Sequence, residues 1–157
     1  MRVAFKLNGR EVACDARENM TLLDLLRDEL GVKSVKKGCQ QGECGACTVL
    51  LGDATVNSCL VLAPQVDGKT VVTIDGLAEE PVMKALCQAF LEGGAIQCGF
   101  CTPGMLISAY ALLVKNPLPT VEQVKSAIEG NLCRCTGYVN IIKAIQDTVE
   151  MIYDEAP

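Results

Sequence analysis

Hydrophobic and polar residues alternate at the start of the chain, and this alternation predicts a pair of β-strands. Residues 2–7 (RVAFKL) and 10–14 (REVAC) each alternate between the two kinds of side chain. Asn8-Gly9, which lies between them, is the type of dipeptide that most strongly favours a two-residue hairpin turn. The chain is therefore expected to begin with a β-hairpin.

The pattern then changes to helical spacing before it returns to strands. Residues 20–32 (MTLLDLLRDELGV) place apolar side chains at helical intervals, with Thr21 as a plausible N-cap and Gly31 as the stop. Residues 47–60 predict two short strands around a Gly-Asp turn, and residues 70–74 predict a last strand. Strands combined with one crossing helix favour a β-grasp arrangement like that of plant ferredoxins.

The sequence of the second half of the chain predicts helices throughout. In the segment 101–117, Thr102 is the expected N-cap and Pro103 occupies the first helical position. In the segment 119–131, Thr120 and Gln123 have capping-box spacing. Four helices with short connections predict a small bundle. The helical segments are residues 82–94, 101–117, 119–131 and 138–155.

Together these patterns predict an α+β protein of two domains. Residues 1–76 are expected to form a β-grasp domain and residues 77–157 a four-helix domain. Half of the 157 residues are hydrophobic, which is enough for a real core.

Composition excludes several classes of protein. The net charge is −5 and the basic residues are scattered, so no nucleic-acid-binding surface is expected. The longest apolar run, MLISAYALLV, is too short to span a bilayer, and the N-terminus resembles a strand rather than a signal peptide. A cytoplasmic location is the expectation.

The ten cysteines are the most informative feature of the composition, because the chain has no histidine. In a reducing cytosol this many cysteines indicate metal binding or redox chemistry rather than disulfides. The lack of histidine excludes Cys2His2 zinc sites, Rieske clusters, histidine-ligated haem and Cys–His catalytic dyads. Only ligation by cysteine alone remains.

Four cysteines form a first group in and after the segment KKGCQQGECGAC. Cys39-x4-Cys44-x2-Cys47, followed at a distance by Cys59, has the spacing of a plant-type [2Fe–2S] site. The glycines between these cysteines allow backbone amides to approach sulfur closely, which favours an anionic cluster. We interpret this group as a [2Fe–2S] site.

A second group combines Cys98-x2-Cys101 in AIQCGFCTPG with Cys133-x-Cys135 in GNLCRCTGY. Two cysteine pairs are also how zinc ribbons are built, so spacing alone leaves zinc as an alternative to iron–sulfur. Each pair precedes a predicted helix, and amides at helix N-termini favour a negatively charged cluster. The other two cysteines, Cys14 and Cys87, are expected to fill the core.

The motifs GCQQGECGACTVLL, QCGFCTPGM and GNLCRCTGY, in this order, resemble those of one family. It is the small iron–sulfur subunit of the molybdenum hydroxylases, which include xanthine dehydrogenase, aldehyde oxidase and carbon monoxide dehydrogenase. The resemblance covers nearly the whole chain, with no departure at a ligand position.

The resemblance implies two [2Fe–2S] clusters and no catalytic residue in this chain. It implies a large partner subunit with a molybdopterin cofactor and a medium partner subunit with FAD, in an assembly of two heterotrimers. It also implies that Gln97 and Cys135 contact the pterin, and that electrons pass from molybdenum through both clusters to FAD. Arg134 is equally compatible with a cation beside the cluster or pterin and with a plain surface arginine. The implied ligands are Cys39, Cys44, Cys47 and Cys59 for one cluster, and Cys98, Cys101, Cys133 and Cys135 for the other.

Three other functions are compatible with part of the pattern: a stand-alone two-cluster electron carrier, a zinc-stabilised interaction module and a disulfide-based redox sensor. Within the resembled family, the segments LGVKSVKKGC and FLEGGAIQCGFCTPGM are most similar to the purine and nicotinate hydroxylases. A purine or other N-heterocycle is therefore the favoured substrate of the whole enzyme. Aldehyde oxidoreductases, carbon monoxide dehydrogenases and 4-hydroxybenzoyl-CoA reductase are the alternatives.

Overall fold

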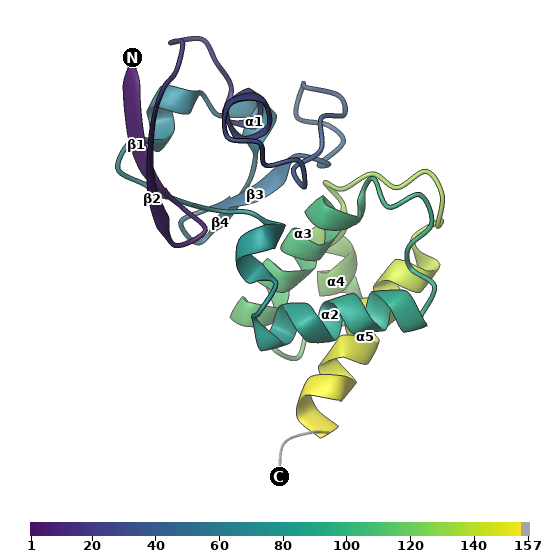
Figure 1. Ribbon diagram of the computed structural model, residues 1–157. Coiled ribbons are helices and arrows are strands. Elements are labelled where there is room, and N and C mark those ends of the chain that lie inside the picture. Colours follow the sequence, from purple (N-terminus) through teal and green to yellow (C-terminus); the bar gives the residue numbers. More distant parts are fainter. Residues whose placement is uncertain (155–157) are drawn as a thin grey trace.

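A mixed five-stranded sheet forms the N-terminal half of the protein in the computed structural model, which describes residues 1–154 (Figure 1). The strand order is β2-β1-β5-β3-β4; β1 and β5 are parallel and the other neighbours are antiparallel. The strands are β1 (Arg2–Leu7), β2 (Arg10–Asp15), β3 (Thr48–Leu51), β4 (Ala54–Asn57) and β5 (Thr70–Val72).

The predicted β-hairpin is confirmed, because Asn8 and Gly9 both have positive φ, 49° and 81°, between paired strands β1 and β2. The predicted helix at 20–32 is shorter than expected. It consists of α1 (Leu22–Asp24) and a π-helical turn η1 (Leu25–Glu29), with Thr21 as the N-cap. The buried leucines of both turns face the sheet, so the apolar spacing alone does not distinguish an α-helix from a π-turn.

The C-terminal half contains four helices, which lie below the sheet in Figure 1. Three short 3₁₀ turns, η2 (Ser58–Leu60), η3 (Ala63–Val66) and η4 (Ile74–Leu77), lie between β4 and the first of these helices. The helices are α2 (Pro81–Glu92), α3 (Thr102–Lys115), α4 (Val121–Ile128) and α5 (Val139–Asp154).

One helix start is as predicted from the sequence, and another differs by one residue. The Thr120–Gln123 capping box is present at the start of α4. The expected N-cap of α3, Thr102, is instead its first helical residue, and Cys101 is the N-cap with helical φ and ψ of −78° and −16°. The helix begins one residue early because the carbonyl of Cys101 already accepts a hydrogen bond from the amide of Met105 at 3.0 Å.

Each half of the protein has its own hydrophobic core, and a few apolar contacts join the two halves. One core lies between the sheet and the leucines of α1 and η1, and the other lies among α2–α5. Leu50 of β3, with Val72 and Ile74 beside it, packs into the helical core rather than the sheet core. The two halves therefore share apolar contacts along β3 and β5. Within residues 1–154, no helix is long and apolar enough to cross a membrane.

Candidate functional site

The first cysteine group is assembled by the β3–β4 hairpin and the loop before it. Cys47 directly precedes β3, and Cys59 lies in the 3₁₀ turn η2 that follows β4. Pairing of Thr48 with Asn57 brings the two cysteines together, close enough for Cys47 to shift the pKa of Cys59. Both are buried, with 2% and 7% of their surface exposed, and burial raises the pKa of Cys59 to about 11.

The other two members of this group, Cys39 and Cys44, lie in the loop between η1 and β3. The amides of Gln41, Glu43 and Cys44 donate hydrogen bonds to Sγ of Cys39 at 3.4, 3.3 and 3.3 Å. The amide of Cys39 in turn donates to Sγ of Cys44 at 3.4 Å. These amides lower the pKa of Cys39 to about 6, so the loop stabilises a negative charge on sulfur.

Close approach of backbone to sulfur requires glycine in this loop. A Cβ atom at Gly38 would lie 2.7 Å from Sγ of Cys44, and Gly42 has a φ of +80° that side chains rarely adopt. The sequence prediction that glycine admits amides to the sulfurs is confirmed by these contacts.

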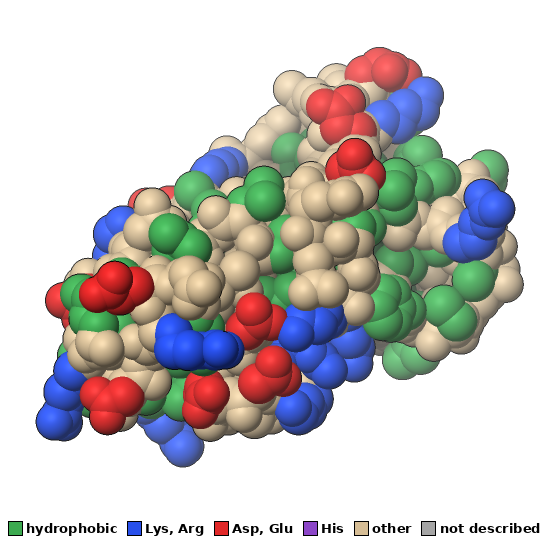
Figure 2. All heavy atoms as spheres, turned by 90° about the horizontal axis from the view of Figure 1, so that it is seen from above, with side chains coloured by type: hydrophobic (Ala, Val, Ile, Leu, Met, Phe, Trp, Pro, Cys, Tyr) green, Lys and Arg blue, Asp and Glu red, His purple; other side chains and the backbone are tan. Residues whose placement is uncertain are grey.

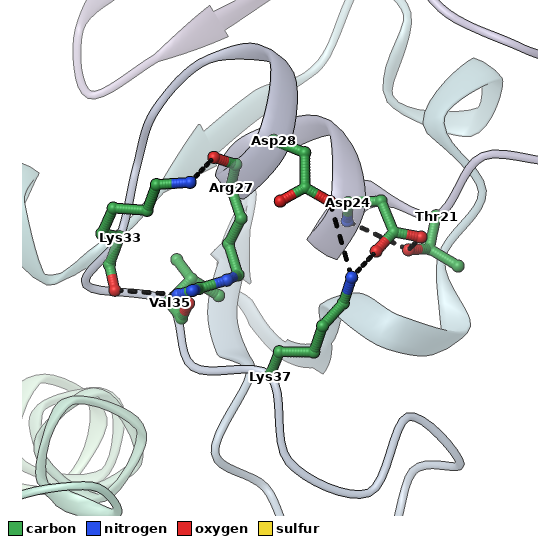
Figure 3. A network of polar contacts seen from close by, with 7 residues as sticks. All are labelled: Thr21, Asp24, Arg27, Asp28, Lys33, Val35 and Lys37. Carbon is green, nitrogen blue, oxygen red and sulfur yellow. Dashed lines mark hydrogen bonds and ion pairs between the residues drawn. The ribbon is translucent and has the colours of Figure 1, made fainter.

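A polar network fixes the segment that leads into this loop (Figure 3). The ammonium group of Lys37 lies 2.5 Å from Oδ1 of Asp24, and Arg27 donates to the carbonyls of Lys33 and Val35 at 3.0 and 2.6 Å. The hydrogen bond from Lys37, and then that from Thr21, hold the pKa of Asp24 below its ordinary value. Oδ1 of Asp24 is enclosed and has no conventional hydrogen bond among the described residues, so Lys37 is its compensating charge.

The second cysteine group is brought together by the loops that precede α3 and α5. Cys101 lies beside Cys133, and Cys98 lies beside Cys135, close enough for each neighbour to shift a thiol pKa. Burial, together with these neighbours, raises the pKa of Cys101 to about 12. Although burial opposes it, hydrogen bonds from Thr136 and the amide of Cys135 hold the pKa of Cys133 below its ordinary value; Oγ1 of Thr136 lies 3.1 Å from Sγ of Cys133.

One edge of this second group faces solvent. Cys98 and Cys135 are exposed, and Nε2 of Gln97 donates to the carbonyl of Cys135 at 3.1 Å. Figure 2 shows one face of the molecule on which acidic and basic side chains mix over one part and hydrophobic side chains predominate over another. Exposed apolar residues next to the exposed cysteines along the chain are Phe100, Leu132 and Val139, which are 47%, 56% and 73% exposed.

The arrangement of the sulfurs distinguishes between the metals that cysteine can bind. A [2Fe–2S] cluster takes two thiolates at each of two irons, whereas structural zinc takes four ligands around one ion. In each group the cysteines lie as two contacting pairs. The donor set therefore fits a binuclear cluster better than zinc.

The remaining cysteines lie apart from both groups. Cys14 packs against the sheet core and Cys87 against the helical core, and burial raises the pKa of each. Arg134, between two members of the second group, is exposed.

Sequence reasoning did not single out three polar residues that shape the second group. Thr136 bonds a sulfur, Tyr138 accepts a hydrogen bond from the amide of Cys133 at 2.9 Å, and Asn131 is buried between the two halves. Their position within GNLCRCTGY was the available signal, because polar residues beside ligands commonly orient them.

Comparison with known proteins finds iron–sulfur domains in both halves of the chain. Two family profiles match the chain, a 2Fe-2S iron–sulfur cluster binding domain at residues 5–92 and a [2Fe-2S] binding domain at residues 73–146. The nicotinate dehydrogenase small FeS subunit of Eubacterium barkeri is 50% identical over 148 residues, covering 94% of both proteins. The xanthine dehydrogenase iron–sulfur-binding subunit of Escherichia coli O157:H7 is 42% identical, covering 90% of this chain and 89% of its own.

A solved structure extends the likeness to the fold. Quinoline 2-oxidoreductase from Pseudomonas putida 86 contains a chain that is 41% identical and superimposes with a TM-score of 0.91, over 100% of this chain and 98% of the other. Identity at this level, over the full length, shows common ancestry as well as a common fold. The chain belongs to the family of small [2Fe–2S] iron–sulfur subunits of the molybdenum hydroxylases, which are oxidoreductases.

Proposed function

We propose that this chain carries two [2Fe–2S] clusters and relays electrons from a molybdopterin centre in a large partner subunit to FAD in a medium partner subunit. The observation that carries the proposal is the pairing of the cysteines two by two in both groups. When bound, each cluster takes up and releases one electron at a time. Iron ligands of the first cluster are Cys39, Cys44, Cys47 and Cys59; those of the second are Cys98, Cys101, Cys133 and Cys135.

The chain's own groups supply charge stabilisation for these clusters. The three amides around Cys39 and the hydroxyl of Thr136 beside Cys133 donate to sulfur. Hydrogen bonds to sulfur favour the reduced, more negative state and raise the potential. No acid, base or nucleophile is assigned to this chain.

The exposed edge of the second group is the surface that we assign to the molybdenum subunit. Cys135 and Gln97 lie there together, and an amide that already bonds the Cys135 carbonyl has a second N–H to offer a pterin. The apolar residues around this edge support a permanent assembly, because surfaces of monomeric proteins seldom collect such residues. We propose a dimer of heterotrimers in the cytoplasm.

We also propose that the chain divides into a β-grasp domain, residues 1–76, and a four-helix domain, residues 77–157. The two hydrophobic cores support this division, although Leu50 and Val72 cross it. The final residues of the second domain lie outside the described part of the chain.

For the substrate of the whole enzyme we propose a nitrogen-containing aromatic ring. The relatives named above are subunits of enzymes for nicotinate, xanthine and quinoline, all of which are N-heterocycles. This choice of substrate rests on the relatives and not on a pocket among residues 1–154.

Two measurements test the proposal. The purified chain should contain four irons and four sulfides, on the stoichiometry of two [2Fe–2S] clusters, and should absorb in the visible range; a colourless protein with zinc would refute it. Native extract should show the chain with two larger subunits that hydroxylate N-heterocycles. A lone species near the chain's own 16.7 kDa would instead support a stand-alone carrier.

A further inference from the structure

Asn131 lies at the junction of the two cysteine groups and is only 4% exposed. Its Nδ2 donates to the carbonyl of Gly45 at 3.1 Å and to Oγ1 of Thr48 at 3.3 Å. Its Oδ1 accepts a hydrogen bond from Oγ of Ser108 in α3 at 2.7 Å. One side chain thus joins the loop before α5, the middle of α3 and the loop that contains Cys44.

The backbone beside Asn131 also connects the two cysteine groups. The amide of Leu132 donates to the carbonyl of Cys44 at 2.8 Å, and Leu132 immediately precedes Cys133. The hydroxyl of Tyr138 donates to the Asn131 carbonyl at 3.2 Å and accepts from the Cys133 amide at 2.9 Å. The position of Asn131 is therefore coupled to ligands of both proposed clusters.

No side chain separates the backbones at this junction. A Cβ atom at Gly45 would lie 2.2 Å from the carbonyl of Gly130, and one at Gly104 would lie 2.4 Å from the carbonyl of Gly45. Backbone packed this closely is sensitive to small shifts, and apolar contacts alone do not fix its register. The directional bonds of Asn131 do fix it, because burying a polar group without its hydrogen-bond partners is costly.

We propose that Asn131 is a positioning residue that sets the coupling between the two cluster sites. It does so by holding the Cys133 loop in one register against the Cys44 loop. The inference rests on the proposed function, because it requires both clusters to be present. It adds to that function a residue that binds no metal and touches no partner.

Asn131→Asp tests the proposal at constant side-chain size. The change replaces the donor that faces the Gly45 carbonyl with an acceptor, and retains an oxygen for Ser108. Gly104→Ala tests the same junction from α3. Matched controls are Asn140→Ala, which removes an amide bond to the Gly94 carbonyl within the helical half, and Gly130→Ala, whose added Cβ meets open space.

The readout is the magnetic interaction between the two clusters in the full-length protein reduced with dithionite. Two nearby paramagnetic clusters split each other's resonance at low temperature, and the splitting depends steeply on their separation and orientation. We expect both junction variants to keep iron content and visible absorption, and to lose part or all of the splitting. Both controls should keep the wild-type splitting.

Unchanged splitting in both junction variants, with only a lower melting temperature, would overturn the proposal and leave Asn131 a merely structural residue. Absence of splitting in the wild type would also overturn it. Absence of iron–sulfur absorption in the wild type would instead refute the proposed function. If Asn131→Asp does not fold, Asn131→Ala, which removes the bonds to Gly45, Thr48 and Ser108 without adding a charge, takes its place with the same expected loss.

Discussion

The amides around Cys39 make this thiol unlike an ordinary cysteine, and its reactivity in the metal-free chain reveals the difference. With its pKa lowered from 9.0 to about 6, the thiol is mostly ionised at pH 7. Thiolate is the nucleophile, but nucleophilicity falls as the pKa falls, with a Brønsted coefficient of about 0.4–0.5. The two effects together leave Cys39 about fourfold more reactive than an ordinary thiol at pH 7.

Iodoacetamide labelling, followed by mass spectrometry, measures this difference against a cysteine peptide. The advantage of Cys39 is expected to disappear at about pH 8 and to reverse at higher pH, because a growing fraction of the peptide thiol is then ionised as well. Cys59, which is buried and has a pKa of about 11, should label slowly throughout. A constant ratio of rates from pH 6 to pH 10 would contradict the amide contacts.

Cys135 and Cys59 differ in their expected effect on electron transfer, because one is exposed and the other is buried. In the whole enzyme, Cys135→Ser should slow substrate-driven reduction of the second cluster more than Cys59→Ser does. Rapid-mixing absorbance follows that reduction, with iron analysis as the control for cluster content. Equal rates in the wild type and Cys135→Ser would remove Cys135 from the path of the electrons.

The grouping of the cysteines could be predicted from the sequence, and the polar residues beside them could not. Spacing predicted two groups of four cysteines, because metal chemistry restricts both residue type and interval, and the members of each group lie together in the structure. Asn131 and Thr136 act through single hydrogen bonds, which many polar residues can make from many positions. Thr102 shows the same limit, since its type favours an N-cap and the structure places it inside the helix.

At the scale of elements, the Lys37–Asp24 ion pair connects α1 to the loop that carries Cys39. Lys37→Met is expected to lower the free energy of unfolding by about 1–2 kcal/mol, because it leaves an enclosed carboxylate oxygen without its charge. The pairwise coupling, from a double-mutant cycle with Asp24→Asn, should be only about 0.5–1 kcal/mol since both side chains are about one-third exposed.

The pH dependence of this coupling follows from the directions of the two pKa shifts. Asp24 has a lowered pKa, so its contribution is present above the unfolded-state pKa of about 4 and is lost as the pH falls through the folded value. Lys37 has a raised pKa, so its contribution is lost only as the pH rises through a value above 10.5. Denaturant unfolding of the four proteins of the double-mutant cycle should give a constant coupling energy between pH 6 and about pH 9. A coupling that grew on acidification would contradict the ion pair.

Most elements could be predicted because hydrophobic spacing and end signals agreed. The hairpin at Asn8-Gly9 and the capping box at Thr120 are set by local chemistry, and both are present. The π-helical turn at Leu25–Glu29 could not be predicted, because it buries the same apolar side chains that an α-helix would bury.

At the scale of the whole molecule, the apolar surface next to the exposed cysteines is expected to be buried in the assembled enzyme. Leu132→Asp and Val139→Asp should each weaken assembly by about 2 kcal/mol, or roughly 30-fold, if these side chains lie at the centre of an interface. Leu118→Asp is a matched control, because Leu118 is 68% exposed and lies beyond the far end of α3. Co-purification of the tagged chain with its partners measures the effect. Equal recovery of all three variants would place the interface elsewhere.

How the two halves meet could not be predicted from the sequence. The junction is made by glycine backbone and a buried amide, and neither leaves a hydrophobic pattern. Leu50 of β3 is a second example, because its side chain packs into the helical core. The sequence pattern predicts that Leu50 is buried, but it does not predict which half of the protein covers it.

The unequal burial of the two cysteine groups has a consequence for how the protein matures. Cys47 and Cys59 are enclosed once the β3–β4 hairpin has closed, so we expect iron and sulfide of the first proposed cluster to arrive while that half of the chain is still folding. Cys98 and Cys135 are exposed in the folded chain, so we expect the second proposed cluster to be inserted at any time before a partner subunit covers its site. The fold would then order maturation, with one cluster tied to folding and the other to assembly.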